Sequence, residues 1–289
     1  MCVTCGCGNT GETNLTLHAI EHEHEHEHVH ADGTRHTHSH APGFAAVPFR
    51  QHTAPHAHEA PVTVPGRDSH IIRLESEILG KNQLLAERNR GCLAAKRILA
   101  LNLVSGPGAG KTTLLERTLQ DLKGEMSIGV IEGDQATSND AERIRATGVP
   151  AVQINTGTGC HLEAEMLERA LTALRPAPAS LLLIENVGNL VCPALFDLGE
   201  RAKVVIFSVT EGEDKPLKYP HMFGAAEVLL LSKIDLLPHV RFDEERAVAN
   251  ALAVNPRLTV FRLSAYTGQG LAEWYGWLKG ELAMQAAVA

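Results

Sequence analysis

A cysteine and a histidine stand side by side in TGTGCHLE, residues 156–163, where the sequence predicts that a helix begins. A third potential ligand, Cys192, lies in GNLVCP, four residues after Gly188. Thiolate and imidazole donors suit Zn²⁺ or Ni²⁺, and a helix N-terminus favours the thiolate form of Cys160. Cys160, His161 and Cys192 would leave one coordination position for water, a partner or a second copy of the chain. The alternative is that both cysteines are ordinary small core residues.

Three further cysteines, Cys2, Cys5 and Cys7, form C-x-x-C-x-C at the start of the sequence. Their sulfurs can reach one ion, the α-amine can supply a fourth donor, and such a set favours a soft or borderline metal ion. An Fe–S cluster normally takes a fourth cysteine, and the other cysteines are far away in sequence. We predict a metal-binding motif over residues 1–8, with lipidation or redox chemistry as the alternatives.

Residues 9–66 are rich in His, Ala, Pro, Thr and Glu, and twelve of the sixteen histidines lie there. Such a composition buries too little surface to offset the entropy cost of ordering, so we expect a disordered linker. Imidazoles in a tract of this kind bind divalent ions weakly and release them as they protonate at about pH 6. Metal storage is the favoured role, and a solvated spacer is the alternative. The histidines predicted to bind are His22, His24, His26, His28, His30, His36, His38 and His40.

The stretch LALNLVSGPGAGKTTLL, residues 99–115, predicts a phosphate site. An apolar strand ends at Ser105, a glycine-rich turn follows, and Lys111 and Thr112 open a helix, which is the order of elements in a P-loop. Lys111 would pair with the β- and γ-phosphates and Thr112 with Mg²⁺. Ser105 stands where the usual motif has its first glycine. The predicted phosphate-binding residues are Gly106, Gly108, Gly110, Lys111, Thr112 and Thr113.

The base is predicted to be guanine, because SKID at 232–235 follows an apolar strand and resembles N-K-x-D. Asp235 would accept hydrogen bonds from guanine that adenine cannot donate, and the stem of Lys233 would cover the ring. Ser232 stands where Asn is usual, which costs about 1 kcal/mol of hydrogen bonding without changing the base. Ser264 and Ala265 resemble the loop that closes over the base.

Two acidic strand ends follow the P-loop in sequence. Asp134 ends one strand, and Glu185 ends another in ENVG, in the place of D-x-x-G. We expect Thr112, Asp134 and Glu185 to hold Mg²⁺ and the amide of Gly188 to contact the γ-phosphate. Lys111, Asp134 and Glu185 are the predicted catalytic residues. Asn189 takes the place of a water-positioning Gln, so we expect slow turnover of about 10⁻⁴ to 10⁻² s⁻¹.

The elements that must position these residues read as an α/β domain. Short apolar runs are separated by helical patterns, which is typical of a parallel sheet covered by helices on both faces. The expected strands are 99–105, 127–132, 151–155, 180–186, 203–209, 227–232 and 259–264, preceded by a helical pattern over 68–97. We therefore predict a P-loop NTPase domain over residues 67–289.

Bulk composition excludes several classes of function. A net charge of −8 argues against a nucleic-acid surface. No apolar run is long enough for a membrane span, and no apolar segment near the start suggests export, so we expect a cytoplasmic protein.

Together, CxxCGC, SGPGAGKTT, EGDQATSNDAERI, NTGTGCH, IENVGNLVCP, VTEGEDKPLKYP and SKIDLLP resemble the hydrogenase nickel-incorporation GTPases, the HypB family. The resemblance covers residues 67–289 and the first seven. It implies a metallochaperone that hydrolyses GTP and delivers Ni²⁺ to the large subunit of [NiFe]-hydrogenase with the maturation protein HypA. It also implies a tight nickel site at Cys2, Cys5 and Cys7. A weaker Ni²⁺/Zn²⁺ site would lie at Cys160, His161 and Cys192, near the interface of a dimer that GTP or metal promotes.

Two alternatives stay open at this point. A urease-type nickel-chaperone GTPase shares the P-loop, but its expected metal motif is Cys-Pro-His, whereas this sequence has Gly-Cys-His and a separate Cys-Pro. The second alternative is a metal-storage protein whose GTPase domain only regulates assembly.

Overall fold

The computed structural model describes residues 15–16, 27–29, 35–37, 67–134 and 138–287. The chain divides into two units, one made of Met1–Leu17 with Ser69–Ala289 and the other of His18–Asp68. The described part of the second unit is a short antiparallel hairpin, in which β2 (Glu27–Val29) pairs with β3 (Arg35–Thr37) and His28 lies opposite His36. This hairpin falls within the 9–66 segment. Cys2, Cys5, Cys7 and the other six predicted tail histidines lie outside the described residues.

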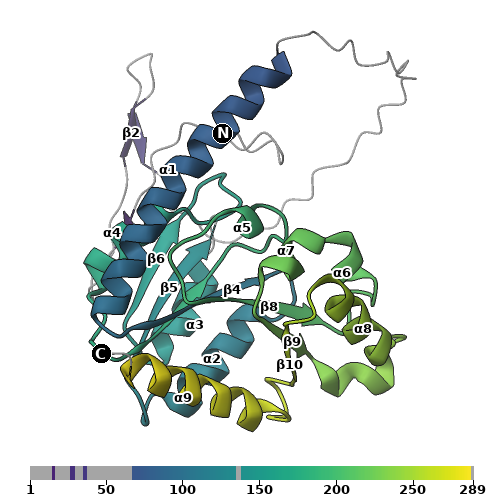
Figure 1. Ribbon diagram of the computed structural model, residues 1–289. Helices are drawn as coiled ribbons and strands as arrows, with labels where there is room; N and C mark the ends of the chain where they lie inside the picture. The colour runs from purple at the N-terminus through teal and green to yellow at the C-terminus, as the bar shows by residue number, and fades with distance from the viewer. Residues whose placement is uncertain (1–14, 17–26, 30–34, 38–66, 135–137, 288–289) are drawn as a thin grey trace. The chain divides into compact units, whose positions relative to one another are not determined.

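In the first unit, the described residues form one sheet of eight strands in the order β1-β6-β5-β7-β4-β8-β9-β10 (Figure 1). Seven strands run parallel to their neighbours, and β1 joins the edge strand β6 in antiparallel orientation. The parallel strands are β4 (Leu99–Ser105), β5 (Ile128–Asp134), β6 (Ala151–Asn155), β7 (Leu181–Glu185), β8 (Ala202–Ser208), β9 (Val228–Ser232) and β10 (Thr259–Arg262), and β1 is Leu15–Thr16.

Helices cover both faces of this sheet (Figure 1). One face carries α2 (Lys111–Leu122), α3 (Ser138–Ala146) and α9 (Leu271–Ala287). The other carries α1 (Arg67–Ala95), α4 (Ala164–Leu174), α7 (Pro220–Ala225) and α8 (Glu244–Val254). Three short elements complete the connections: α5 (Cys192–Leu195), α6 (Lys215–Lys218) and the 3₁₀ helix η1 (Ile234–His239).

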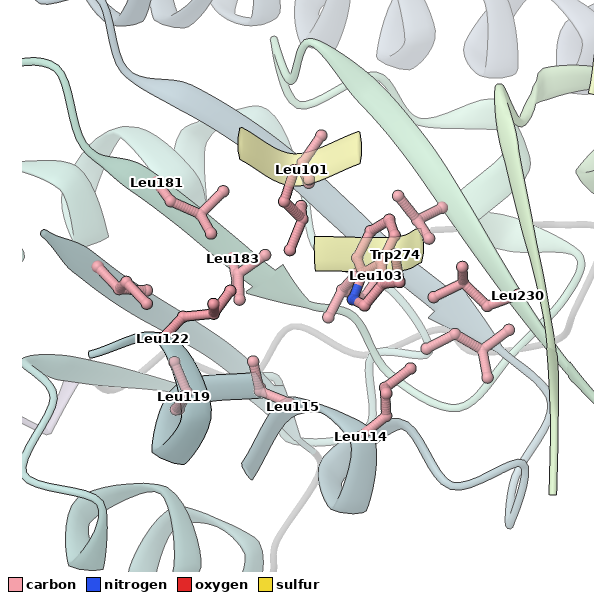
Figure 2. Packing of buried hydrophobic residues seen from close by; sticks show 14 of the residues in the cluster. Leu101, Leu103, Leu114, Leu115, Leu119, Leu122, Leu181, Leu183, Leu230 and Trp274 are labelled. Atoms are coloured by element: carbon pink, nitrogen blue, oxygen red, sulfur yellow. The ribbon is translucent and has the colours of Figure 1, made fainter. Parts of the chain in front are cut away.

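The central strand β4 explains why the sheet is buried on both sides. All seven of its residues are buried, and alternate side chains enter different cores: Leu101 and Leu103 face α2 and α9, whereas Ala100 faces α1 and α4. Figure 2 shows the first of these cores, in which leucines of β4, β7 and α2 surround Trp274 of α9. Parallel strands buried on both faces are expected to be mostly apolar, and β4 is apolar except for Asn102 and Ser105.

The predicted fold class is confirmed. The strands predicted at 99–105 and 151–155 are observed with the same bounds, and the other five differ from the predicted bounds by one or two residues at an end. The helical pattern at 68–97 forms α1. One local prediction was wrong: α4 begins at Ala164, so Cys160 and His161 lie in the loop before the helix and not at its N-terminus. Among the described residues, the helices are too short or too polar to cross a membrane.

Candidate nucleotide and metal sites

The P-loop has the geometry that its sequence predicts. It connects the central strand β4 to α2, and Gly108 and Gly110 have φ angles of +73° and +96°, where residues with a Cβ are strained. A Cβ on Gly106 would lie 2.6 Å from Oε1 of Glu211, so a larger residue here would require the Glu211 side chain to move. The loop and the strand ends beside it line a cavity of about 450 Å³. Its walls include Gly108, Gly110, Lys111, Thr112, Thr113, Asp134, Glu185, Gly188 and Lys233.

Ser105 has a specific role in place of the usual glycine. Its Oγ accepts a hydrogen bond from Lys111 Nζ at 3.1 Å and donates one to the carbonyl of Gly106 at 2.6 Å. Burial lowers the pKa of Lys111, although the carboxylates of Glu185 and Asp140 oppose that shift. The Lys111 ammonium group is therefore hydrogen-bonded to a neutral hydroxyl inside the phosphate cavity. A phosphate oxygen can replace this hydroxyl as its hydrogen-bond partner.

Three of the predicted magnesium and catalytic residues meet in this cavity. The Thr112 hydroxyl lies 2.7 Å from Glu185 Oε1 and 3.2 Å from Asp140 Oδ2, and Asp134 lines the same wall. Glu185 Oε2 is buried and has no hydrogen-bond partner among the described residues. A hydroxyl, a carboxylate oxygen without a partner and further carboxylates are the donors that Mg²⁺ takes, so the residues present fit this ion.

The pKa values of acidic residues in this cavity also indicate a site for a cation. Burial, together with the charge of Glu185, raises the pKa of Glu132 to about 8, and Glu132 lines the cavity beside Asp134. Burial also raises the pKa of Glu185, against the effects of Lys111 and the Thr112 hydroxyl. Buried acidic groups with raised pKa values indicate a shortage of positive charge, which a divalent cation would supply.

Two of the residues predicted to read the base, Ser232 and Lys233, are hydrogen-bonded to the P-loop. Ser232 Oγ donates to the carbonyl of Ala109 at 2.9 Å, so the hydroxyl is bonded to the P-loop. Lys233 Nζ donates to the carbonyl of Gly108 at 2.7 Å. Lys233 has a φ of +60°, which costs a residue with a Cβ about 1 kcal/mol and is typical of functional sites.

Asp235, Ser264 and Ala265 lie outside the lining of the phosphate cavity. The Asp235 carboxylate makes no hydrogen bond or ion pair with another described residue. The carbonyl of Ala265 accepts a hydrogen bond from Arg117 of α2 at 3.2 Å, which fixes this loop against the helix that follows the P-loop.

The three predicted internal metal ligands come together. The ligand atoms of Cys160, His161 and Cys192 all lie within 4.8 Å of one another. Cys160 and His161 follow β6, and Cys192 follows β7, so both segments lie at the carboxyl edge of the sheet, as the sequence predicts. Cys192 is fully buried and Cys160 is partly exposed. A distance of this size allows one ion to contact all three residues.

His161 is held in its metal-binding form. Its ring packs on Phe196 with 3.9 Å between centroids, and burial lowers its pKa to about 4, so the imidazole is neutral at pH 7. Nε2 is buried without a hydrogen-bond partner among the described residues, and Nδ1 lies 3.6 Å from the Cys160 sulfur. A buried neutral imidazole with an unused nitrogen is suited to a metal ion.

Comparisons with known proteins identify the family. Residues 100–262 match the family "CobW/HypB/UreG, nucleotide-binding domain". The "Hydrogenase maturation factor HypB" of Escherichia coli strain K12 is 49% identical over 288 residues, which cover 96% of this chain and 98% of that protein. The chain belongs to the HypB family of hydrogenase maturation GTPases. This membership favours the HypB type over the urease-type alternative.

Solved HypB structures share the fold. HypB from Archaeoglobus fulgidus matches with a TM-score of 0.66 and 41% identity, covering 70% of this chain and 99% of the other. HypB from Helicobacter pylori in complex with nickel matches with a TM-score of 0.66 and 38% identity, covering 71% of this chain and 96% of the other.

In this HypB family member, α1 makes hydrogen bonds to the segments that follow Cys160–His161 and Cys192. These contacts were not predicted from the sequence. Asn82 accepts a hydrogen bond from the Ala164 amide at 2.8 Å and donates to the Asp197 carbonyl at 2.7 Å. Asn89 donates to the carbonyls of Ala164 at 2.8 Å and Leu198 at 3.0 Å. The segment after Cys160 and His161 is thereby tied to the segment after Cys192. Two asparagines seven residues apart in this helix were the only available signal.

Sequence reasoning also assigned no arginine to the phosphate site. Arg143 of α3 lines the cavity, where it donates to Thr113 Oγ1 at 3.2 Å and pairs with Glu116 at 2.7 Å and with Asp140 at 3.5 Å. Asp140 and Arg143 are three residues apart on one helix, so their common face could have been noticed.

Proposed function

We propose that this HypB family member is a nickel metallochaperone GTPase. It binds Ni²⁺ as cargo, couples the binding to its GTP state, and delivers the ion to the large subunit of [NiFe]-hydrogenase together with HypA. Homodimerisation promoted by GTP or metal places the internal metal site near the interface, and the protein works in the cytoplasm. Zn²⁺ competes with Ni²⁺ for the same Cys/His donor set.

One observation carries the proposal: the metal cluster and the phosphate cavity share a peptide segment. Gly188 packs against the P-loop, because a Cβ on it would lie 3.3 Å from Pro107 Cα. Cys192 lies four residues further along, with its sulfur beside the ligand atoms of Cys160 and His161. A movement of Gly188 on gain or loss of the γ-phosphate would therefore reach one metal ligand directly.

The residues of the cavity account for GTP binding and slow hydrolysis. The backbone N–H groups of Gly106 and of Gly108 to Thr113 bind the phosphates, and Lys111 pairs with their charge. Thr112, Asp134 and Glu185 would hold Mg²⁺, which when bound neutralises phosphate charge. Asp235 accepts hydrogen bonds from guanine. Asn189 follows Gly188 in place of a Gln, and its amide group is hydrogen-bonded to the Cys160 carbonyl and the Val191 amide, so the attacking water lacks a Gln side chain from that position.

The nucleotide dependence of Ni²⁺ affinity tests the proposal. Cys2, Cys5 and Cys7 are changed to Ala together, so that only the internal site and the tail contribute, and Ni²⁺ is titrated in GDP and in a non-hydrolysable GTP analogue. We expect affinities that differ by about 5- to 150-fold between the two states, with a matching effect of Ni²⁺ on nucleotide affinity. Equal affinities together with equal dimerisation would refute the coupling.

Metal storage is a second candidate function, favoured by the twelve histidines of residues 9–66. Changing His22, His24, His26, His28, His30, His36, His38 and His40 to Asn removes most of those imidazoles while keeping the length of the chain. If this variant still restores hydrogenase activity at limiting nickel, delivery is the primary role; if it fails at limiting nickel and succeeds at high nickel, storage is required.

A further inference from the structure

Two asparagines on either side of Gly188 both bond to the loop that carries Cys160 and His161. Asn186 Oδ1 accepts a hydrogen bond from the Leu162 amide at 3.1 Å. Asn189 Nδ2 donates to the Cys160 carbonyl at 3.4 Å. The peptide that packs on the P-loop is therefore attached to the metal-binding loop both before and after the glycine.

Asn186 is placed as a fixed anchor. It is 1% exposed, its Oδ1 also accepts from the Val187 amide at 3.0 Å, and its Nδ2 donates to Asn102 Oδ1 at 3.1 Å. Asn102 lies in the central strand and donates in turn to Glu200 Oε1 at 3.0 Å. A buried polar network with its hydrogen bonds made is expensive to disturb, so this attachment stays in place when the nucleotide changes.

The Cys160–Leu162 loop is also fixed from the other side. Leu162 is fully buried, and its Cδ2 lies 2.6 Å from the position that a Cβ on Gly133 would take, so only glycine fits between Glu132 and Asp134. With Asn186 on one side and β5 on the other, the loop has little freedom to move. Any change in the metal site must then come from the segment between Gly188 and Cys192.

Asn189 lies in that segment, and its amide group spans the two metal-binding chains. Its Nδ2 donates to the carbonyl of Cys160, and its Oδ1 accepts from the amide of Val191 at 2.8 Å, directly before Cys192. Unlike Asn186, it is partly exposed. One side chain next to Gly188 thus bridges the backbone of one thiol ligand to the backbone next to the other.

We propose that Asn189 is a positioning residue that converts movement of Gly188 into a change in the separation of the Cys160 and Cys192 sulfurs. This inference rests on the proposed function, because it names the contact through which nucleotide and metal communicate. In this proposal the hydrogen bonds of Asn186 stay in place when the nucleotide changes, whereas Asn189 moves with Gly188.

Two substitutions separate the two hydrogen bonds of Asn189. In Asn189→Ala both are lost, whereas Asn189→Asp keeps an acceptor for the Val191 amide and loses the donor to the Cys160 carbonyl. The matched control is Asn155→Ala. Asn155 Oδ1 accepts from the Gly157 amide at 2.8 Å in the same metal-binding loop, and its side chain makes no hydrogen bond to residues 185–192 among those described.

The measurement is the ratio of Ni²⁺ affinities in the GTP-analogue and GDP states, in full-length protein with Cys2, Cys5 and Cys7 changed to Ala. The thiolate-to-Ni²⁺ charge-transfer band is recorded in both states as the signature of the sulfur ligands. We expect the parent ratio to lie at about 5 or above and the Asn189→Ala and Asn189→Asp ratios to fall to within about twofold of one, with the same band in both states. Asn155→Ala should keep the parent ratio.

The outcomes are distinguishable. A parent ratio of one overturns this inference, and together with equal dimerisation in the two states it overturns the proposed function as well. A parent ratio well above one that Asn189→Ala and Asn189→Asp both retain overturns this inference alone. If Asn155→Ala lowers the affinity ratio to the same extent, this inference is also overturned, because any loosening of the loop would then remove the nucleotide dependence of Ni²⁺ affinity.

Discussion

Gly199 provides a test of how α1 joins the nucleotide domain. It has a φ of +91°, and a Cβ on it would overlap the Ala86 carbonyl oxygen and lie 2.8 Å from the Arg90 amide nitrogen. Both atoms belong to the backbone of α1, which cannot move aside as the end of a flexible side chain can. We therefore expect Gly199→Ala to push α1 away from the loop that follows Cys192.

The size of the effect follows from two contributions. Placing a residue with a Cβ in the left-handed region costs about 1–2 kcal/mol, and overpacking adds about 1–3 kcal/mol. The free energy of unfolding should thus fall by roughly 2–5 kcal/mol. For a domain of this size each kcal/mol lowers the Tm by about 2–4 °C, so we expect a fall of roughly 4–20 °C.

The assay is thermal unfolding of the full-length protein, followed by far-ultraviolet circular dichroism. Gly80→Ala and Gly91→Ala are matched controls, because both glycines lie in α1 and neither has an atom within 4 Å of the added Cβ. Alanine is the better helix former by about 0.5–1 kcal/mol, so both controls should keep or raise the Tm. A Tm for Gly199→Ala equal to that of the controls would refute the close packing of α1 and its place in the 67–289 domain.

Three further changes test the nucleotide site and the α1 contact. Asp235→Ala should weaken GTP binding roughly 10- to 150-fold in calorimetry, because hydrogen bonds to a charged group are lost, and leave ATP binding unchanged; an equal loss for both nucleotides would exclude a role in base choice. Thr112→Val removes one hydroxyl at nearly constant volume and should raise the Mg²⁺ concentration needed for half-maximal GTP turnover, whereas an unchanged Mg²⁺ dependence would remove Thr112 from the ion's ligands. Burial alone would raise the pKa of Asp197, but hydrogen bonds from the Gly199 amide and the Arg90 guanidinium hold this pKa below its usual value. The charged Asp197 therefore stabilises the fold above the unfolded pKa, and this stabilisation is lost as pH falls through the folded pKa. Asp197→Asn should flatten the fall of Tm in acid, and a variant curve parallel to the parent curve would contradict this.

Local patterns were enough to predict the sheet. Most of the parallel strands are short, largely apolar runs buried on both faces, whereas the edge strand β10 is partly exposed. The 3.6-residue helical pattern between the runs leaves few other architectures. The P-loop was also predictable, since its glycines, Lys111 and Thr112 are adjacent in sequence.

The proximity of the three predicted metal ligands could be predicted because the topology of the sheet brings them together. Two segments that follow parallel strands of one sheet end at the same edge, so Cys160, His161 and Cys192 were expected to meet, and their ligand atoms lie within 4.8 Å. The start of α4 was predicted several residues too early. Cys160 and His161 continue into the apolar pattern of the helix, but that pattern does not show where the first helical turn begins.

The residues that sequence reasoning missed act across long separations. Asn82 and Ala164 are 82 residues apart, and Asn186 and Asn102 are 84 apart. Asparagines have no periodicity that identifies a partner, and each gains its role only when helix, strand and loop are packed. Arg143 was missed for the same reason, since its contacts with Glu116 and Thr113 come from another helix.

We propose that the segment from Glu185 to Cys192 moves in response to the terminal phosphate and that the metal ligand Cys192 moves with it. Crystal structures of the Ni²⁺-loaded protein with GDP and with a non-hydrolysable GTP analogue test this most directly. We predict that Cys192 Sγ shifts relative to Cys160 Sγ between the two structures, together with Gly188 and Asn189. Two structures that superpose through this segment, with the sulfur unmoved and the subunit arrangement the same, would contradict the account.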